Sequence, residues 1–193
     1  MFLFFAVVRF NYSLVLGLFY AASESFLSLR RRSGPDTISS DRNSLRILWA
    51  VILLSVILSQ LVISTRIGMV PHSRLIPIIG VALFVCGIVL RWYSISYLGR
   101  FFTVDVAIAP GHELIESGPY RFIRHPSYTG ALLAFFGFAL TLGNWLASLC
   151  LVLPIAAAFF WRIHVEERAL CDALGEDYRG YVSRTKRLLP FIY

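Results

Sequence analysis

The stretch from His125 to Trp161, HPSYTGALLAFFGFALTLGNWLASLCLVLPIAAAFFW, decides the fold, because its 37 residues include no Asp, Glu, Lys or Arg. As a single helix it would be about 55 Å long at 1.5 Å per residue, whereas the hydrocarbon core of a bilayer is about 30 Å thick. The stretch must therefore reverse direction. Gly143 and Asn144 tolerate a backbone reversal, and Trp145 suits a membrane interface. We predict a helical hairpin with its turn at residues 142–145.

Three further apolar regions precede this hairpin, at Phe2–Leu29, Ile47–Ser64 and Leu75–Leu98. Of the 193 residues, 58% are hydrophobic and 15% charged, whereas a soluble domain carries about a quarter charged residues. The first region could pass for a signal peptide, but no basic segment precedes it and Arg9 interrupts it. We therefore expect an all-α integral membrane protein with five transmembrane helices in a single domain, residues 1–193.

The basic residues predict the orientation of these helices. Thirteen lie in residues 30–46, 100–124 and 168–187, on one side of the expected membrane, and only Arg66 and Arg74 lie on the other. Basic residues concentrate on the cytoplasmic side, so the N-terminus should face out. The long polar loop from Gly99 to Ser127 and a C-terminal helix should then be cytoplasmic. Because the +7 net charge flanks apolar segments, it suits anionic lipids and does not indicate a nucleic acid partner.

Polar residues gather directly before the hairpin, in GPYRFIRHPSYTG at residues 118–130. Pro126 pushes His125 toward extended backbone, and Ser127 can then cap the following helix. The free backbone N–H groups of such a helix start can receive a carboxylate or a phosphate. The same pattern also fits a basic helix start with two interfacial tyrosines, and both interpretations stay open.

A second polar cluster, FFWRIHVEE at residues 159–167, lies at the end of the hairpin. Arg162 and Glu166 are four residues apart and share a helix face. Charges at such a depth are more often functional than incidental, although an arginine at a membrane exit can also snorkel to the interface. Beyond this cluster, Gly175 predicts a helix end, and Tyr178 and Tyr181 follow at the spacing of a short amphipathic helix.

Several common kinds of site lack their signature in this sequence. His164 with Glu166 and Glu167 matches no strong metal-ligand spacing, so we expect no metal. The thirteen glycines include no GxG, which removes the Rossmann fingerprint and the P-loop, and the three cysteines form no CxxC pair. Any nucleotide-like cofactor must therefore be held by a different device.

Together these segments resemble one family. LGRFFTVDVAIAPGHELIESGPYRFIRHPSYTG, EERAL, GEDYRGYVSR and LLPF, which lie between Leu98 and Phe191, are similar to the isoprenylcysteine carboxyl methyltransferase family. That family shares its architecture with membrane phospholipid methyltransferases and, more distantly, with sterol reductases. The resemblance divides the chain into generic membrane helices, residues 1–96, and a cofactor-binding and catalytic half, residues 97–193.

The resemblance implies that S-adenosylmethionine is bound between the cytoplasmic loop and the fifth helix. It implies that Arg162, facing the acceptor, and Glu167 are the catalytic residues. The cofactor-binding residues that it implies are His112, Glu113, Leu114, Ile115, Tyr120, His125, Pro126, Ser127, Tyr128 and Glu166. Glu166 suits the cofactor's ammonium group, and tyrosine faces suit its sulfonium and adenine.

The expected reaction is O-methylation of a lipophilic carboxylate, most simply that of an isoprenylcysteine, at the cytoplasmic face of the membrane. Such a carboxylate is ionised at neutral pH and needs no general base. Three alternatives stay open: phospholipid N-methylation, a sterol-reductase-like reaction with a nicotinamide cofactor, and lipid binding or transport without catalysis. The sequence fixes neither the acceptor nor the oligomeric state.

Overall fold

The computed structural model describes residues 2–30, 38–41, 43–71, 73–102, 106–108 and 114–190. Over these residues the fold is all-helical apart from one short pair of strands, as the sequence predicted. The five α-helices are α1 (Phe2–Arg30), α2 (Asn43–Thr65), α3 (Leu75–Leu98), α4 (Pro126–Thr141) and α5 (Trp145–Arg184).

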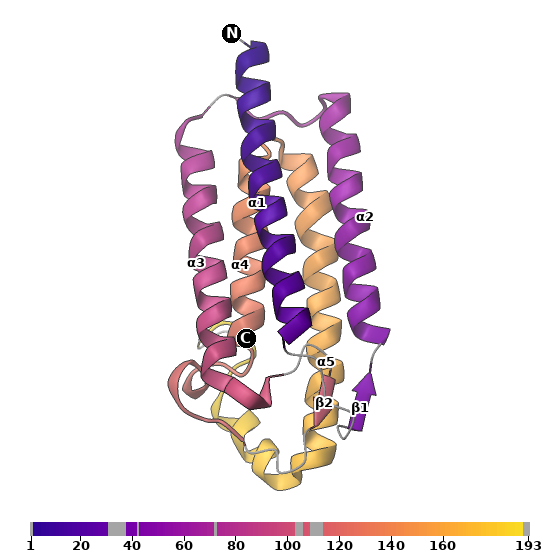
Figure 1. Cartoon of the computed structure of the whole chain (residues 1–193), viewed down its shortest axis with the longest axis vertical. Coiled ribbons are helices and arrows are strands. Elements are labelled where there is room, and N and C mark those ends of the chain that lie inside the picture. Colours follow the sequence, from indigo (N-terminus) through magenta and orange to yellow (C-terminus); the bar gives the residue numbers. More distant parts are fainter. Residues whose placement is uncertain are drawn as a thin grey trace.

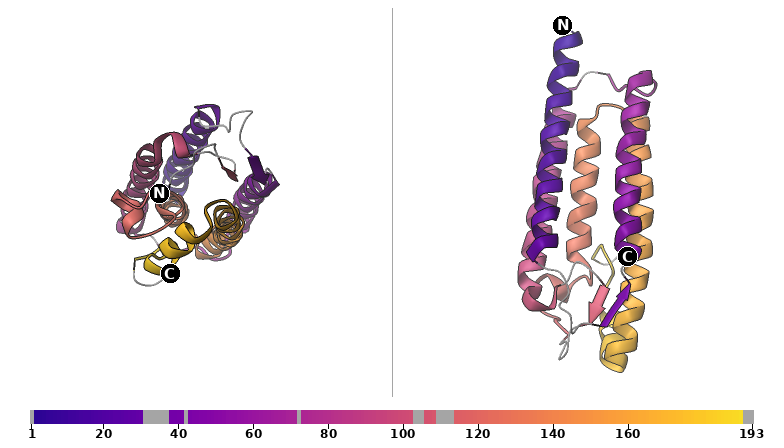
Figure 2. Two further views of the ribbon diagram at one scale, coloured as in Figure 1. Left: turned by 90° about the horizontal axis from the view of Figure 1, so that it is seen from below. Right: turned by 45° about the vertical axis from the view of Figure 1, so that its right-hand side comes forward.

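The helices form one elongated bundle in which neighbours along the chain run in opposite directions (Figure 1). α3 packs along α4, α2 packs along α5, and α4 and α5 lie side by side. α1, α2, α3 and α5 are long and apolar enough to cross a membrane, while α4 is apolar but has only 16 residues. The strands β1 (Ile38–Asp41) and β2 (Val106–Ile108) lie beside the end of α5 at one end of the bundle (Figure 2).

The turn of the predicted hairpin lies where the sequence placed it, between Thr141 and Trp145. Gly143 has a φ of 64°, in the left-handed region that glycine adopts freely. The Asn144 side chain accepts a hydrogen bond from the Ala147 N–H at 3.0 Å and so caps α5. Its amide also donates to the Ile67 carbonyl at 2.7 Å, which ties this turn to the loop after α2.

Glycines allow α3 and α4 to approach until their backbones touch. A Cβ added at Gly87 would lie 2.5 Å from the Gly130 carbonyl oxygen and 2.5 Å from the Ala134 nitrogen. Gly80 and Gly137 form a second contact of this kind, seven residues along each helix. Close packing at small residues is a main source of helix association in membranes. The closely packed α3–α4 pair therefore supports the loop that leads into α4.

The polar end of the bundle is built from short elements. β1 (Ile38–Asp41) pairs antiparallel with β2 (Val106–Ile108), and two 3-10 helices, η1 (Gly99–Phe101) and η2 (Gly118–Arg121), flank the second strand. α5 is interrupted at Gly175, which has φ 56° and ψ −125°. This kink confirms the predicted helix end at Gly175, and it turns the last stretch of α5 so that Tyr178 and Tyr181 are buried.

Gly87→Ala is expected to destabilise the protein by about 1–3 kcal/mol, because the new methyl group meets backbone atoms that cannot move aside. Gly180→Ala is the matched control, since Gly180 lies in α5 with no atom near its missing Cβ. The melting temperature in detergent measures both. Equal melting temperatures for the two variants would contradict the packing described for α3 and α4.

Candidate active site

The C-terminal segment fixes the stretch that leads into α4. The Arg124 N–H donates to the Lys186 carbonyl at 2.8 Å, and the His125 N–H donates to the Arg187 carbonyl at 3.0 Å. The Thr129 hydroxyl donates to the Leu188 carbonyl at 2.8 Å. Residues 185–188 thus run beside residues 123–125 like a short added strand, and they hold the start of α4 from outside the membrane helices.

Glu167 is the charged centre of this arrangement. Its side chain is 10% exposed, and Arg124 donates from Nε to Oε1 at 2.8 Å, while Arg187 donates from Nε to Oε2 at 2.9 Å. His125 Nε2 lies 3.3 Å from Oε1. The Arg124 guanidinium also donates to the Thr185 and Val182 carbonyls. The Glu167 carboxylate therefore joins α5, the start of α4 and the C-terminal segment.

The prediction that Ser127 caps α4 is wrong. The helix starts two residues earlier than this prediction requires, at Pro126, with His125 as its N-cap and without a side-chain cap. Proline is favoured at this position because its fixed φ suits a helix and its missing N–H costs nothing there. The Tyr128 and Thr129 N–H groups both donate to the His125 carbonyl, each at 3.0 Å. Two of the groups expected to receive an anion are therefore already used within the turn.

Tyr128 lies between the two polar residues that the sequence placed on one face of α5. Its hydroxyl donates to Glu166 Oε2 at 2.6 Å and accepts from Arg162 Nε at 3.1 Å. Arg162, which is 3% exposed, also donates from Nη1 to the Ser44 hydroxyl of α2 at 2.8 Å. The His125 ring stacks on Tyr128 with 5.5 Å between ring centroids. Side chains of α2, α4 and α5 are thereby joined in one network.

Other predicted site residues lie around this network. Tyr120 is buried, and its hydroxyl donates to the Ser94 carbonyl of α3 at 3.1 Å. Burial raises the pKa of Tyr120 well above its ordinary value, so this hydroxyl stays protonated. Leu114 and Ile115 are half-buried in the loop before η2. His112 and Glu113 lie outside the described residues.

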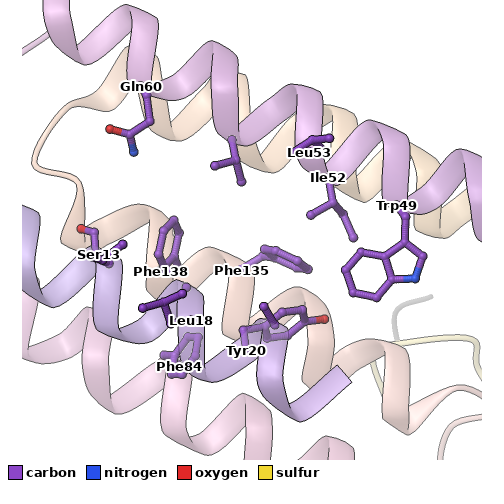
Figure 3. A pocket seen from close by; sticks show the side chains of 14 residues that line it. Ser13, Leu18, Tyr20, Trp49, Ile52, Leu53, Gln60, Phe84, Phe135 and Phe138 are labelled. Carbon is purple, nitrogen blue, oxygen red and sulfur yellow. The ribbon is translucent and has the colours of Figure 1, made fainter. Parts of the chain in front are cut away.

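A large apolar cavity of about 490 Å³ lies beside the network, between α1 and α2. Its walls include Leu18 and Tyr20 of α1, Trp49 and Ile52 of α2, and Phe135 of α4, whose side chains converge on it (Figure 3). The volume falls within the range of small-molecule sites. The lining is almost wholly hydrocarbon and aromatic, as a lipid tail requires.

A small pocket of about 30 Å³ adjoins this cavity. Tyr20, Trp49 and Ile52 line both spaces, and the small pocket also has Arg162 and Tyr128 in its walls. It also holds Glu24 of α1 and Arg91 of α3, which form an ion pair at 2.6 Å. An apolar space thus adjoins a pocket that contains two guanidinium groups, which suits an amphipathic molecule with an anionic end.

The network contains residues to which the sequence analysis gave no role: Glu24, Ser44, Arg91, Arg124 and Arg187. Arg91 and Glu24 each interrupt an apolar helix, and an intramembrane charge is by itself a sign of function. Arg124 lies in the polar stretch at residues 118–130, but the sequence does not indicate its partners. Glu167 and the C-terminal segment, which it contacts, are far from it along the chain. Among the described residues, no group of three or more His, Cys, Asp and Glu side chains is arranged to hold a metal ion.

Glu167→Gln is expected to destabilise the fold by about 3–5 kcal/mol, because buried cations lose their counter-charge. The loss should appear first as faster proteolysis within residues 176–190, which the carboxylate holds in place. Glu176→Gln is the control, since Glu176 makes only an exposed pair with Arg179, and such pairs contribute little. Unchanged melting and proteolysis of Glu167→Gln would contradict its central position.

Comparison with known proteins identifies the region that carries the site. Residues 80–172 match the model of the isoprenylcysteine carboxyl methyltransferase (ICMT) family. A probable protein-S-isoprenylcysteine O-methyltransferase of Oryza sativa subsp. indica is 33% identical over 116 residues, which are 59% of this chain and 61% of the relative. The protein-S-isoprenylcysteine O-methyltransferase of Xenopus laevis is 35% identical over 120 residues, 60% of this chain and 41% of the relative.

A solved structure agrees with these matches. The structure of the eukaryotic intramembrane Ras methyltransferase ICMT aligns with a TM-score of 0.54 and 25% identity, covering 76% of this chain and 52% of that one. The chain spans about three fifths or less of these relatives. The expected resemblance is confirmed: over residues 80–172, a little under half of this chain, the sequence is similar to the isoprenylcysteine carboxyl methyltransferase family.

Proposed function

We propose that this chain is a membrane methyltransferase that uses S-adenosylmethionine to esterify the carboxylate of a lipophilic acceptor, an isoprenylcysteine or a close analogue. The observation that carries the proposal is that the apolar cavity adjoins the small pocket lined by Arg162 and Tyr128, with Tyr20, Trp49 and Ile52 in the walls of both. The first space suits a prenyl chain, and the guanidinium at the second suits a carboxylate. The names of the relatives, protein-S-isoprenylcysteine O-methyltransferases, support the same acceptor.

Arg162 is the residue that we assign to the acceptor carboxylate. Its guanidinium is buried in the wall of the small pocket, and it is held from two sides, by Tyr128 and by Ser44. A planar guanidinium can bind a carboxylate with two parallel hydrogen bonds. An arginine at this place favours an anionic acceptor over the amine of a phospholipid headgroup.

The residues around Tyr128 fit S-adenosylmethionine by their chemistry. Glu166 is partly exposed beside this site and offers a carboxylate to the cofactor's ammonium group. The His125 and Tyr128 rings offer stacked aromatic faces, which suit a cation or a purine. Tyr178 adds a buried hydroxyl that has no hydrogen-bond partner among the described residues; a buried donor of this kind is rare without a ligand or water. When bound, the cofactor supplies an activated methyl group.

The remaining predicted residues fall into two groups. Pro126 and Ser127 fix the backbone at the start of α4, and His112, Glu113, Leu114, Ile115 and Tyr120 are assigned to the cofactor by their place in the family motif. Glu167 was expected to be catalytic, but its carboxylate is occupied by Arg124, Arg187 and His125. We therefore assign Glu167 to holding the site together and not to contact with the reacting groups.

We place the site on the cytoplasmic side of the membrane. The loops that carry it lie at the end of the bundle where the basic residues are concentrated, in residues 30–46, 100–124 and 168–187. A cytoplasmic cofactor reaches that side directly. The apolar cavity between α1 and α2 lets the tail of the acceptor stay in the hydrocarbon core.

The direct test is incubation of the purified protein in lipid nanodiscs with methyl-labelled S-adenosylmethionine and N-acetyl-S-farnesylcysteine. The expected product is a methyl ester that releases labelled methanol in alkali. Arg162→Lys should lower kcat/KM for the acceptor about ten- to a hundredfold, because a point-charge ammonium loses the paired, charge-assisted hydrogen bonds of the fork. Arg179→Lys, an exposed change on the same helix, should leave it unaltered. Base-stable label in a phospholipid headgroup would refute the assigned acceptor.

Cofactor binding is expected to depend on Glu166. Glu166→Gln keeps the size of the side chain but removes the charge that faces the ammonium group, so the affinity should fall about ten- to a hundredfold. Calorimetric titration with S-adenosylmethionine measures this without an acceptor. Glu176→Gln, on the exposed part of α5, serves as the control. A folded Glu166→Gln variant with wild-type affinity would remove Glu166 from the cofactor site.

A further inference from the structure

A buried ion pair joins α1 to α3 inside the bundle. Glu24 is 5% exposed and Arg91 is 7% exposed. Arg91 donates from Nε to Glu24 Oε1 at 2.6 Å and from Nη2 to Oε2 at 2.7 Å, which is the two-pronged geometry of a guanidinium on a carboxylate. Burying two charges is costly and stabilises a fold little or not at all relative to an apolar pair. Such a pair in a membrane helix calls for a further role.

The third nitrogen of the Arg91 guanidinium, Nη1, contacts the start of α4. Nη1 donates to the Ser127 carbonyl at 3.3 Å. Because the guanidinium is planar, its pairing with Glu24 also fixes the direction in which Nη1 donates. The contact is possible because Gly130 lets α4 approach α3 closely: a Cβ at Gly130 would lie 2.6 Å from the Arg91 backbone nitrogen.

Ser127 immediately precedes the residue at the centre of the candidate site. Tyr128 bridges Glu166 and Arg162, so a shift or rotation of the first turn of α4 would move its hydroxyl away from both. Glu24, Arg91, Tyr128 and Arg162 all line the same small pocket. The ion pair is therefore built onto the side of the site that faces α1, opposite the Glu167 cluster.

We propose that Arg91, oriented by Glu24, is a positioning residue that fixes the first turn of α4 and thereby holds Tyr128 between the cofactor side chain Glu166 and the acceptor side chain Arg162. This inference rests on the proposed function, because it assigns the two neighbours of Tyr128 to cofactor and acceptor. It gives α1 a part in the reaction beyond lining the cavity, since the carboxylate that orients Arg91 comes from that helix.

A simpler role for the ion pair would be to attach α1 to α3. A separate hydrogen bond between the residues next to the pair also attaches these helices. The Trp92 indole N–H donates to the Ser23 hydroxyl at 2.8 Å. This hydrogen bond joins the same two helices through the residues next to Glu24 and Arg91. It makes Ser23→Ala a matched control for the loss of a polar tie between α1 and α3.

The experiment compares Arg91→Lys, the double variant Glu24→Gln/Arg91→Gln, and Ser23→Ala by calorimetric titration with S-adenosylmethionine and by melting temperature. Lysine keeps the pairing with Glu24 but cannot hold Glu24 and Ser127 together, while the double variant leaves no unpaired buried charge. Both should bind the cofactor more weakly by about two- to tenfold, the range of one net hydrogen bond. Ser23→Ala should keep wild-type affinity even if its melting temperature falls.

The outcomes separate the two proposals. Wild-type affinity in both Arg91 variants overturns the positioning role, as does an equal loss of affinity in Ser23→Ala. If Arg91→Lys fails to fold, the double variant alone decides by the same criterion. A wild-type protein that binds no S-adenosylmethionine overturns the proposed function and the positioning role together.

Discussion

The Glu167 carboxylate is the interaction on which the rest of the candidate site depends. It receives Arg124 from the segment before α4, Arg187 from the C-terminal segment and His125 from the start of α4. These residues are far apart in sequence, and backbone hydrogen bonds from Arg124 and His125 to the C-terminal segment complete the attachment. A membrane domain with little soluble core thus uses one charged cluster to order its polar end.

The apolar part of the bundle is ordered by a different force. The hydrophobic effect does not drive helices together in lipid. α3 and α4 instead associate through close backbone packing at Gly80, Gly87, Gly130 and Gly137. That contact is also what brings the Arg91 side chain within reach of Ser127. Tight packing on one side of the bundle contrasts with the large cavity between α1 and α2, where a ligand has room.

The sequence predicted the features that depend on local chemistry. The length of the uncharged run, with Gly143 and Asn144 inside it, determined the hairpin, and Gly175 determined the kink in α5. Arg162 and Glu166 do share a site, because four-residue spacing is a property of the helix itself. The resemblance to the family came from short motifs that lie on loops and helix ends.

What the sequence could not predict were pairings between distant segments. Glu24 and Arg91 are 67 residues apart, and Arg124 and Glu167 are 43 apart, so no local pattern shows that they meet. The surroundings of neighbouring residues were also not predictable: Glu167, which the resemblance implied to be catalytic, is enclosed by cations, whereas Glu166 is partly exposed. The start of α4 was misplaced by two residues because Pro126 serves as the first helical residue and needs no capping side chain.

The shortness of α4 sets the depth at which chemistry can occur. Its 16 residues extend about 24 Å, roughly 6 Å less than the thickness of the hydrocarbon core. At one end, the exposed Trp145 suits the membrane interface. With Trp145 at one interface, a helix of this length ends about 6 Å short of the opposite headgroups, so His125 and Tyr128 at its other end would lie within the thickness of the hydrocarbon core. The length of this one helix would thus bring the polar network to the depth of the lipid tails.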